Sequence, residues 1–202
     1  MKKIIWLFPA LLCLFASCKK NGSTPNNSAN ALSGSWNFTS LTSQTEASDE
    51  YNIGGDDFKD VTTSNYTSTD NAGTVNFSGG TAKSSGISYS VSTTLFLSSY
   101  EDNVLVDTTS SPFSSTVPSS GGTSTYKIIG TDSVFFAGGF VTSGDLTGGA
   151  PQPSTAIGYK FHVSGNTLIM TSAIAKDSIE DLGGVSTQVH EAASFSVTLT
   201  KQ

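Results

Sequence analysis

The stretch ISYSVSTTLFL, residues 87–97, shows the pattern that decides the fold. Its apolar residues fall on one face of an extended chain, with serines and threonines largely opposite: Ile87, Tyr89, Val91, Leu95 and Leu97. Because successive side chains of a strand point to opposite faces of a sheet, this period of two predicts a β-strand. One face of that strand is expected to be buried and the other to lie in water.

Similar alternating segments recur along the chain and are separated by turns rich in glycine, asparagine and aspartate. A first strand is expected around Trp36 and Phe38, where apolar and polar residues alternate. The other predicted strands are 74–77, 87–97, 104–108, 125–129, 133–136, 156–163, 167–173 and 193–200. Eight or nine short antiparallel strands predict an all-β fold, either a closed barrel of about eight strands or a β-sandwich.

Three segments interrupt this pattern. Residues 110–122 and 142–153 are expected to be loops, because serine, proline and glycine dominate them and no alternation is visible. Residues 173–182 carry a weak helical period and end at Gly183 and Gly184, so one short helix is expected there. The chain is long enough to bury a core, and residues 32–202 are expected to form one domain.

The first seventeen residues differ from the rest. Lys2 and Lys3 form a basic start, and residues 4–15 form an apolar run. This run is too short for a membrane-spanning helix, which needs about 20 residues. The pattern is typical of a secretory signal peptide, and residues 1–17 are predicted to be one.

The sequence Phe15-Ala16-Ser17-Cys18 follows at the expected cleavage site. It resembles the lipobox of bacterial lipoproteins, which implies that Cys18 becomes the lipid-modified N-terminus. Residues 18–31 then form a lipidated cysteine and a flexible tether, since they contain little to bury. The expected location is the cell envelope, with the lipid in the outer membrane and the domain facing either the periplasm or the surface.

Composition excludes several classes of function. The chain has a net charge of −6, and the loss of Lys2 and Lys3 with the leader would make it more acidic. It contains no arginine, the residue that best recognises phosphate, so no nucleic-acid partner is expected. Its cysteines are Cys13 in the leader and Cys18 at the cleavage site, which leaves none for a disulfide, a thiol nucleophile or a metal site.

Two segments of the chain echo each other. Residues 126–130 followed by 134–136 match the pattern of residues 159–163 followed by 168–170. Each pair consists of an amphipathic strand that begins with tyrosine, a tight turn and an apolar returning strand. The chain therefore contains two similar predicted β-hairpins.

The first predicted strand opens with Gly34-Ser35-Trp36. Together with the repeated hairpins, this tripeptide resembles the lipocalin-like lipoproteins of Bacteroidetes-type bacteria over residues 32–201. The resemblance implies an up-and-down barrel in which Gly34 and Trp36 close one end. Lipocalins pack an arginine on this tryptophan, and Lys201 is the candidate to take its place.

Residues that often carry chemistry do not converge in the sequence. Asp56, Asp57 and Asp60 form the densest acidic cluster, but their spacing is not that of an EF-hand, so a solvated turn is expected. His162 and His190 are far apart, and alternation turns His162 toward solvent. The Gly-x-Ser-x-Gly motif of a serine nucleophile is absent. We therefore expect no catalytic residues, metal or cofactor, and no enzymatic activity.

Three Asp-Ser/Thr sequences resemble the O-glycosylation site of exported Bacteroidetes proteins. They place the candidate acceptors at Thr108, Ser133 and Ser178. The same dipeptides are common in turns at strand edges, so a purely structural role is the alternative.

Aromatic residues suggest where a ligand could bind. Trp36 is expected in the core, whereas Tyr51, Tyr66 and Tyr100 are expected in loops, where they could stack on a sugar. The favoured function is a non-enzymatic binding module that takes a small apolar molecule into the barrel. The alternative is a structural or accessory lipoprotein whose loops contact a glycan or a partner protein. A hollow barrel would favour the first function and a filled barrel the second.

Overall fold

The computed structural model describes residues 31–138 and 156–202. Its elements are all β-strands, which confirms the predicted class: β1 (Gly34–Ile53), β2 (Asp56–Thr67), β3 (Thr69–Ser78), β4 (Thr81–Glu101), β5 (Val104–Ile129), β6 (Ser133–Phe136), β7 (Ile157–Ser164), β8 (Thr167–Leu182) and β9 (Val185–Lys201). In this part of the chain, no helix has the length and apolar character needed to cross a membrane.

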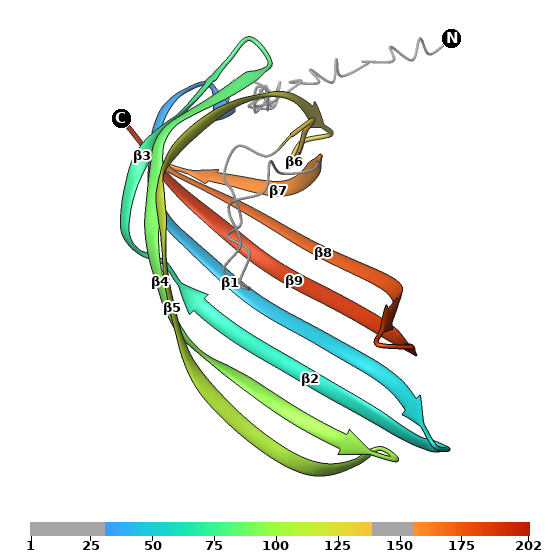
Figure 1. Ribbon diagram of the computed structural model, residues 1–202. Helices are drawn as coiled ribbons and strands as arrows, with labels where there is room; N and C mark the ends of the chain where they lie inside the picture. Colours follow the sequence, from blue (N-terminus) through green and yellow to red (C-terminus); the bar gives the residue numbers. More distant parts are fainter. Residues whose placement is uncertain (1–30, 139–155) are drawn as a thin grey trace, which may run out of the picture.

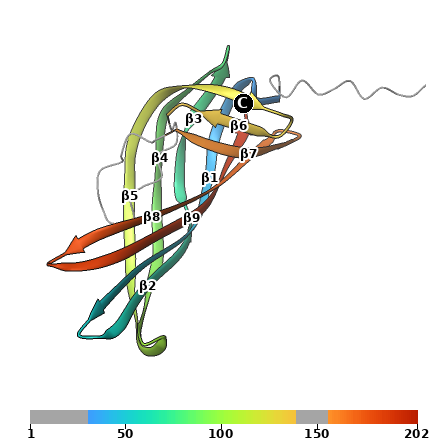
Figure 2. The same ribbon diagram turned by 90° about the vertical axis from the view of Figure 1, so that its right-hand side faces the viewer.

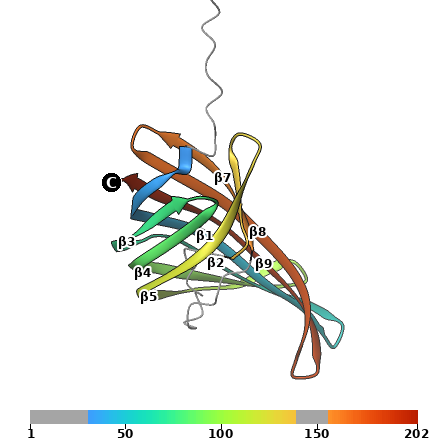
Figure 3. The same ribbon diagram turned by 90° about the horizontal axis from the view of Figure 1, so that it is seen from above.

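The strands form a single antiparallel sheet that closes on itself. β9 pairs back with β1 and completes a ring of eight strands, so the predicted barrel is confirmed and the sandwich is not. β2 and β3 share one position in this ring, between β1 and β4. Figure 3 shows the end of β9 beside the start of β1, where Trp36 pairs with Lys201.

The strand pairing is interrupted at Ser68, which lies between β2 and β3 and forms hydrogen bonds with β1. The Leu41 N–H donates to Ser68 Oγ and the Ser68 N–H donates to the Leu41 carbonyl, both at 2.8 Å. The Ser68 hydroxyl in turn donates to Asn71 Oδ1 at 2.6 Å. Because these bonds satisfy the buried backbone groups, the strand can bend without leaving a donor unpaired.

The ring is complete at one end only. β5 pairs with β6 over Tyr126–Ile129, although β5 begins at Val104. β7 pairs with β8 only as far as Thr171, although β8 runs to Leu182. We call residues 45–67, 92–117 and 173–194 the open half, and the other described residues the closed half. Figure 1 shows the long strands leaving the closed half and spreading apart.

Three hairpins end the open half. The β1–β2, β4–β5 and β8–β9 hairpins all point away from the closed half (Figure 2). Several large apolar side chains near their turns are more than half exposed: Ile53, Val104, Leu105, Val106, Ile179 and Leu182. Both ends of the domain, by contrast, lie at the closed half.

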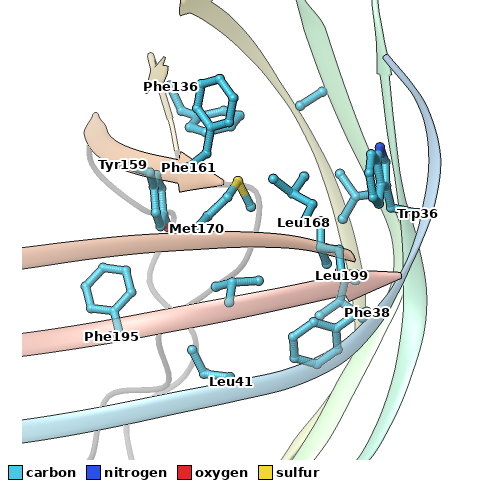
Figure 4. Packing of buried hydrophobic residues seen from close by; sticks show 14 of the residues in the cluster. Trp36, Phe38, Leu41, Phe136, Tyr159, Phe161, Leu168, Met170, Phe195 and Leu199 are labelled. Atoms are coloured by element: carbon cyan, nitrogen blue, oxygen red, sulfur yellow. The ribbon is translucent and has the colours of Figure 1, made fainter. Parts of the chain in front are cut away.

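Side chains fill the closed half. The core collects inward-facing residues from all strands of the ring, and Figure 4 shows Trp36, Phe136, Leu168 and Leu199 converging there. Aromatic rings meet edge to face, with the centroids of Phe136 and Tyr159 5.6 Å apart. Edge-to-face contact places the positive rim of one ring against the negative face of another. The closed end of the barrel is therefore a packed core.

Two expectations about local structure are wrong. Residues 110–122 are not a loop but part of β5, where Pro112 and Pro118 occupy an edge strand that tolerates proline. Residues 173–182 are not a helix but part of β8, because β9 pairs with them to the end. Residues 142–153 lie within the segment that the structure does not describe. β2 is not among the predicted strands, and the predicted strands 104–108 and 125–129 are both parts of β5. Most other strands are longer than predicted, since the threonine- and serine-rich segments continue the pairing.

Candidate functional site

A cleft of about 720 Å³ opens in the barrel wall between the β6–β7 hairpin and the β8–β9–β1 layer. It arises because β7 stops pairing with β8 at Lys160 and Thr171, while β8 and β9 continue into the open half. The residues that line it come from both faces of the sheet: Thr42, Ser43, Gln44, Ile129, Ser133, Val134, Phe135, Gly158, Tyr159, Lys160, Thr171, Ser172, Ala173, Ser194, Phe195 and Ser196.

The buried residues of the lining are Val134, Tyr159, Phe195 and one polar residue, Ser43. Tyr159 and Phe195 are buried and meet edge to face with their centroids 5.7 Å apart. Val134 is also buried, whereas Phe135 is 40% exposed. A Cβ added to Gly158 would meet no heavy atom within 4 Å, so nothing packs against this exposed position of β7. The cleft therefore offers apolar surface with space beside it.

Lys160 and Asp132 form an ion pair at the rim of the cleft. Lys160 Nζ donates to both carboxylate oxygens of Asp132, at 3.0 and 3.1 Å. This hydrogen bond, with a second from the Ser133 hydroxyl, holds the pKa of Asp132 below its usual value. Ser172 Oγ donates to the Gly158 carbonyl at 2.7 Å and so bridges β7 and β8. With its ionic groups paired, this rim favours an uncharged ligand.

Trp36 lies on the other side of the core from Tyr159 and Phe195 (Figure 4). Its indole is fully buried, as predicted, and Nε1 donates to the Leu32 carbonyl at 2.8 Å. Lys201 Nζ lies 5.5 Å from the centroid of the ring, close enough for a cation–π interaction. A Cβ on Gly34 would approach Lys201 Cε to 3.6 Å. Gly34, Trp36 and Lys201 thus meet where the first and last strands join.

Charge is distributed unevenly between the two halves. Most of the acidic residues lie in the open half: Glu46, Asp49, Glu50, Asp56, Asp57, Asp60, Glu101, Asp102, Asp107, Asp177, Glu180, Asp181 and Glu191. The described lysines of the closed half are Lys83, Lys127, Lys160 and Lys201. Those of the open half are Lys59 and Lys176. The described domain is therefore acidic at its free end and mildly basic where its chain begins and ends.

The acidic cluster at residues 56–60 does not form the expected turn but begins β2, where it makes local hydrogen bonds. Asp60 accepts hydrogen bonds from Tyr51 and Ser99, and the Asp57 N–H donates to Asp102 Oδ1 at 3.2 Å. Within residues 31–138 and 156–202, no three His, Cys, Asp or Glu side chains come together as a metal site. The acids serve to join the β1–β2 and β4–β5 hairpins.

The two histidines lie on different strands. His162 is exposed on β7, as predicted from alternation. His190 is on β9, with Nδ1 2.6 Å from Asp177 Oδ1 on β8. The structure does not bring the two histidines into one site, because their strands diverge beyond the cleft.

The three tyrosines expected in loops all lie in strands, which is a correction. Tyr51 is on β1, Tyr66 on β2 and Tyr100 on β4. Tyr66 is buried, and desolvation raises the pKa of its hydroxyl. Tyr51 stacks on Phe58 with the centroids 5.5 Å apart. These segments become strands by pairing, as Tyr51 does with Phe58 across the β1–β2 hairpin, and their own sequence pattern could not place the tyrosines.

The candidate acceptors for sugars are spread over three elements. Thr108 is exposed on β5, Ser133 begins β6 and Ser178 is half-buried on β8. Each acceptor directly follows an aspartate in the sequence. The Thr108 N–H donates to Asp107 Oδ1 at 2.9 Å. Cys18, the candidate lipidation site, lies outside the described residues.

Comparison with known proteins identifies no relative. No protein-family model matches the chain, and no match is found among curated proteins or solved structures. Functional inference therefore depends on the cleft and the surface of the domain. Sequence reasoning missed the cleft because alternation places Tyr159 and Phe195 in the core. The gap beside them depends on where β7 and β8 part.

Proposed function

We propose that this chain is a lipid-anchored, lipocalin-like protein of the cell envelope that binds a small apolar molecule without catalysing a reaction. The observation that supports this function is the wall cleft between β6–β7 and β8–β9–β1. Its volume of about 720 Å³ is typical of small-molecule sites, which range from roughly 300 to 1,000 Å³. Its floor is formed by Tyr159, Phe195 and Val134, and its ionic rim is self-paired.

The cleft is a better site than the interior of the closed half. That interior is occupied by the packed side chains of Trp36, Phe136, Leu168 and their neighbours. A ligand there would have to displace core residues, which costs several kcal/mol for each large side chain. At the cleft, the apolar side chains of Ile129 and Phe135 are already exposed.

The proposed anchor also gives the domain an orientation. The described chain begins at the closed half, which carries Lys83, Lys127, Lys160 and Lys201. A lipid on Cys18 would hold this half toward the membrane, where lysines are attracted by anionic headgroups. The acidic open half would then extend away from the membrane.

Replacing Cys18 with alanine is expected to release the protein from the membrane. Stable anchoring needs more than one acyl chain, and Cys18 is the proposed attachment point for them. Fractionation of the envelope followed by immunodetection would measure the result. We expect the unchanged chain in the membrane fraction and the C18A chain in the soluble fraction. Equal membrane retention of the two chains would contradict the proposed anchor.

Filling the cleft is expected to abolish binding of an apolar probe. Ala173 is exposed and lines the cleft on the face of the sheet opposite to Phe195, because it pairs with Ser194, so Ala173→Phe would place a ring at the outer part of the proposed site. The probe is N-phenyl-1-naphthylamine, a neutral fluorophore, titrated into the purified chain. We expect the dissociation constant for the probe to rise by about tenfold or more, because the ring would occupy part of the volume that the probe needs.

Ala175 provides the matched control. It lies two residues farther along β8, is equally exposed and does not line the cleft. Ala175→Phe should therefore leave probe binding unchanged, while its added apolar surface equals that of A173F. If A173F and A175F bind the probe equally well, or the unchanged chain does not bind it, the cleft is not the site.

A further inference from the structure

Among the described residues, β8 has one edge without a partner strand along most of its length. Within the described residues, β7 pairs with β8 only as far as Thr171, whereas β9 continues beside β8 to Leu182. Figure 1 shows β8 as the outermost strand of the layer that it forms with β9, β1 and β2. The edge at residues 173–182 therefore presents backbone N–H and C=O groups, onto which another extended chain can add.

β5 has the other such edge in the described part of the chain, but its sequence opposes strand addition. Pro112 and Pro118 lack an N–H, and the register of β5 with β4 shifts near Ile87. Proline and bulges are common means by which proteins block edge pairing. Residues 172–182 contain neither proline nor glycine, and the pairing of β8 with β9 is regular throughout. Strand addition is therefore favoured at β8.

We propose that two copies of this chain associate by antiparallel pairing of their β8 edges, with Ser178 of one copy opposite Ser178 of the other. When a two-fold axis perpendicular to the sheet relates two identical antiparallel strands, one residue of the first strand lies directly opposite the same residue of the second. In this register Lys176 lies opposite Glu180 of the second copy, and the symmetry repeats the pair. Ile174 likewise lies opposite Leu182, also twice. The edge is thus complementary to itself in charge and in apolar character.

The surroundings on β9 strengthen these pairs. Lys176 Nζ lies 3.9 Å from Glu191 Oε2 of its own chain, so in the dimer it would lie between two carboxylates. Ile174 and Leu182 are 52% and 53% exposed in the single chain. Their neighbours on β9 are Ala193 and Val185, which extend the apolar surface that pairing would cover.

Adjacent registers are excluded by like charges. A two-fold axis at Asp177 would place Asp177 opposite its own copy. An axis at Ile179 would place Asp177 opposite Asp181, and the symmetry would repeat this contact. Directly opposed like charges destabilise a strand pair. In the Ser178 register no acidic residue of β8 faces another, so charge selects this register.

Charge reversal at the two positions tests the pairing. Because a single strand edge forms a small interface, we expect dissociation of the dimer at concentrations on the order of tens of micromolar. Sedimentation velocity of the purified full-length chain in detergent would measure it. Lys176→Glu and Glu180→Lys each turn two attractive pairs into repulsive ones, so each should raise the dissociation constant at least about tenfold.

Mixing the two variants distinguishes pairing from misfolding. K176E carries two glutamates at these positions and E180K carries two lysines, so one copy of each restores both ion pairs. An equimolar mixture should form a heterodimer as stable as the original homodimer. Glu191→Gln is the control: it removes the internal partner of Lys176 but neither opposed pair, so dimerisation should persist.

Three results would overturn the proposal. They are a native chain that stays monomeric at millimolar concentration, a dimer that both reversals leave intact, and a mixture that associates no better than its components. In the first case the β8 edge would remain open to an extended segment of a different protein, and self-pairing would be wrong.

Discussion

Trp36→Ala is expected to lower the free energy of unfolding by about 4 kcal/mol, within the range measured for large aromatic side chains removed from cores. The indole is fully buried where the first and last strands join, and its Nε1 donates to the Leu32 carbonyl. Alanine would leave a cavity and an unpaired buried carbonyl. Because Trp36 itself supplies fluorescence, urea unfolding should be followed by circular dichroism.

Lys201→Gln separates the contribution of the cation from that of the packed ring. It removes the charge over the indole but keeps a side chain of similar length. A cation–π contact at such a site contributes about 0.5–1 kcal/mol, so the loss should be several times smaller than for W36A. If W36A and K201Q shift the unfolding midpoint equally, the indole does not anchor the closed end.

Gly73→Ala is expected to destabilise the domain by about 3 kcal/mol or more through backbone strain and a clash. Gly73 lies in β3 with a φ of +104°, and a Cβ there would lie 2.6 Å from backbone atoms of Gly86 in β4. The register of β3 with β4 shifts at this point, so neither strand can move away without loss of pairing. The same urea titration measures the effect.

Gly79→Ala is the control for the effect of a positive φ alone. Gly79 has a φ of +56°, but nothing lies within 4 Å of an added Cβ. Its replacement should cost only about 1 kcal/mol, the strain of a left-handed alanine. A loss for G73A no larger than that for G79A would mean that β3 and β4 are not in close contact at Gly86.

Alternation predicted the face of each residue better than the length of each strand. Tyr89, Val91 and Phe195 are buried as their pattern indicated, and His162 is exposed. The pattern failed over residues 110–122 and 173–182, where strands are rich in serine, threonine and charge. These segments are strands because they pair across hairpins with β4 and β9, and the pattern of a single segment does not show that the neighbouring segment will pair with it.

The candidate site was less predictable than the fold. Tyr159 and Phe195 are more than thirty residues apart in the sequence, and each alone has the pattern of an ordinary core residue. They border a cleft because β7 is short and β8 is long, which leaves the wall open beyond Thr171. The free edge of β8 has the same origin.

The sequence by itself determined that this chain folds as an antiparallel β-structure with Trp36 in its core, because alternating side chains must place their apolar face away from water. The sequence also indicated the hairpins that β5 forms with β6 and β7 with β8. Only the tertiary structure decided that β9 pairs with β1, that the ring closes at one end, and that acids from distant segments gather at the other. The physical reason is that hydrogen bonds between strands join any two extended segments, and the choice among partners depends on packing of the whole core.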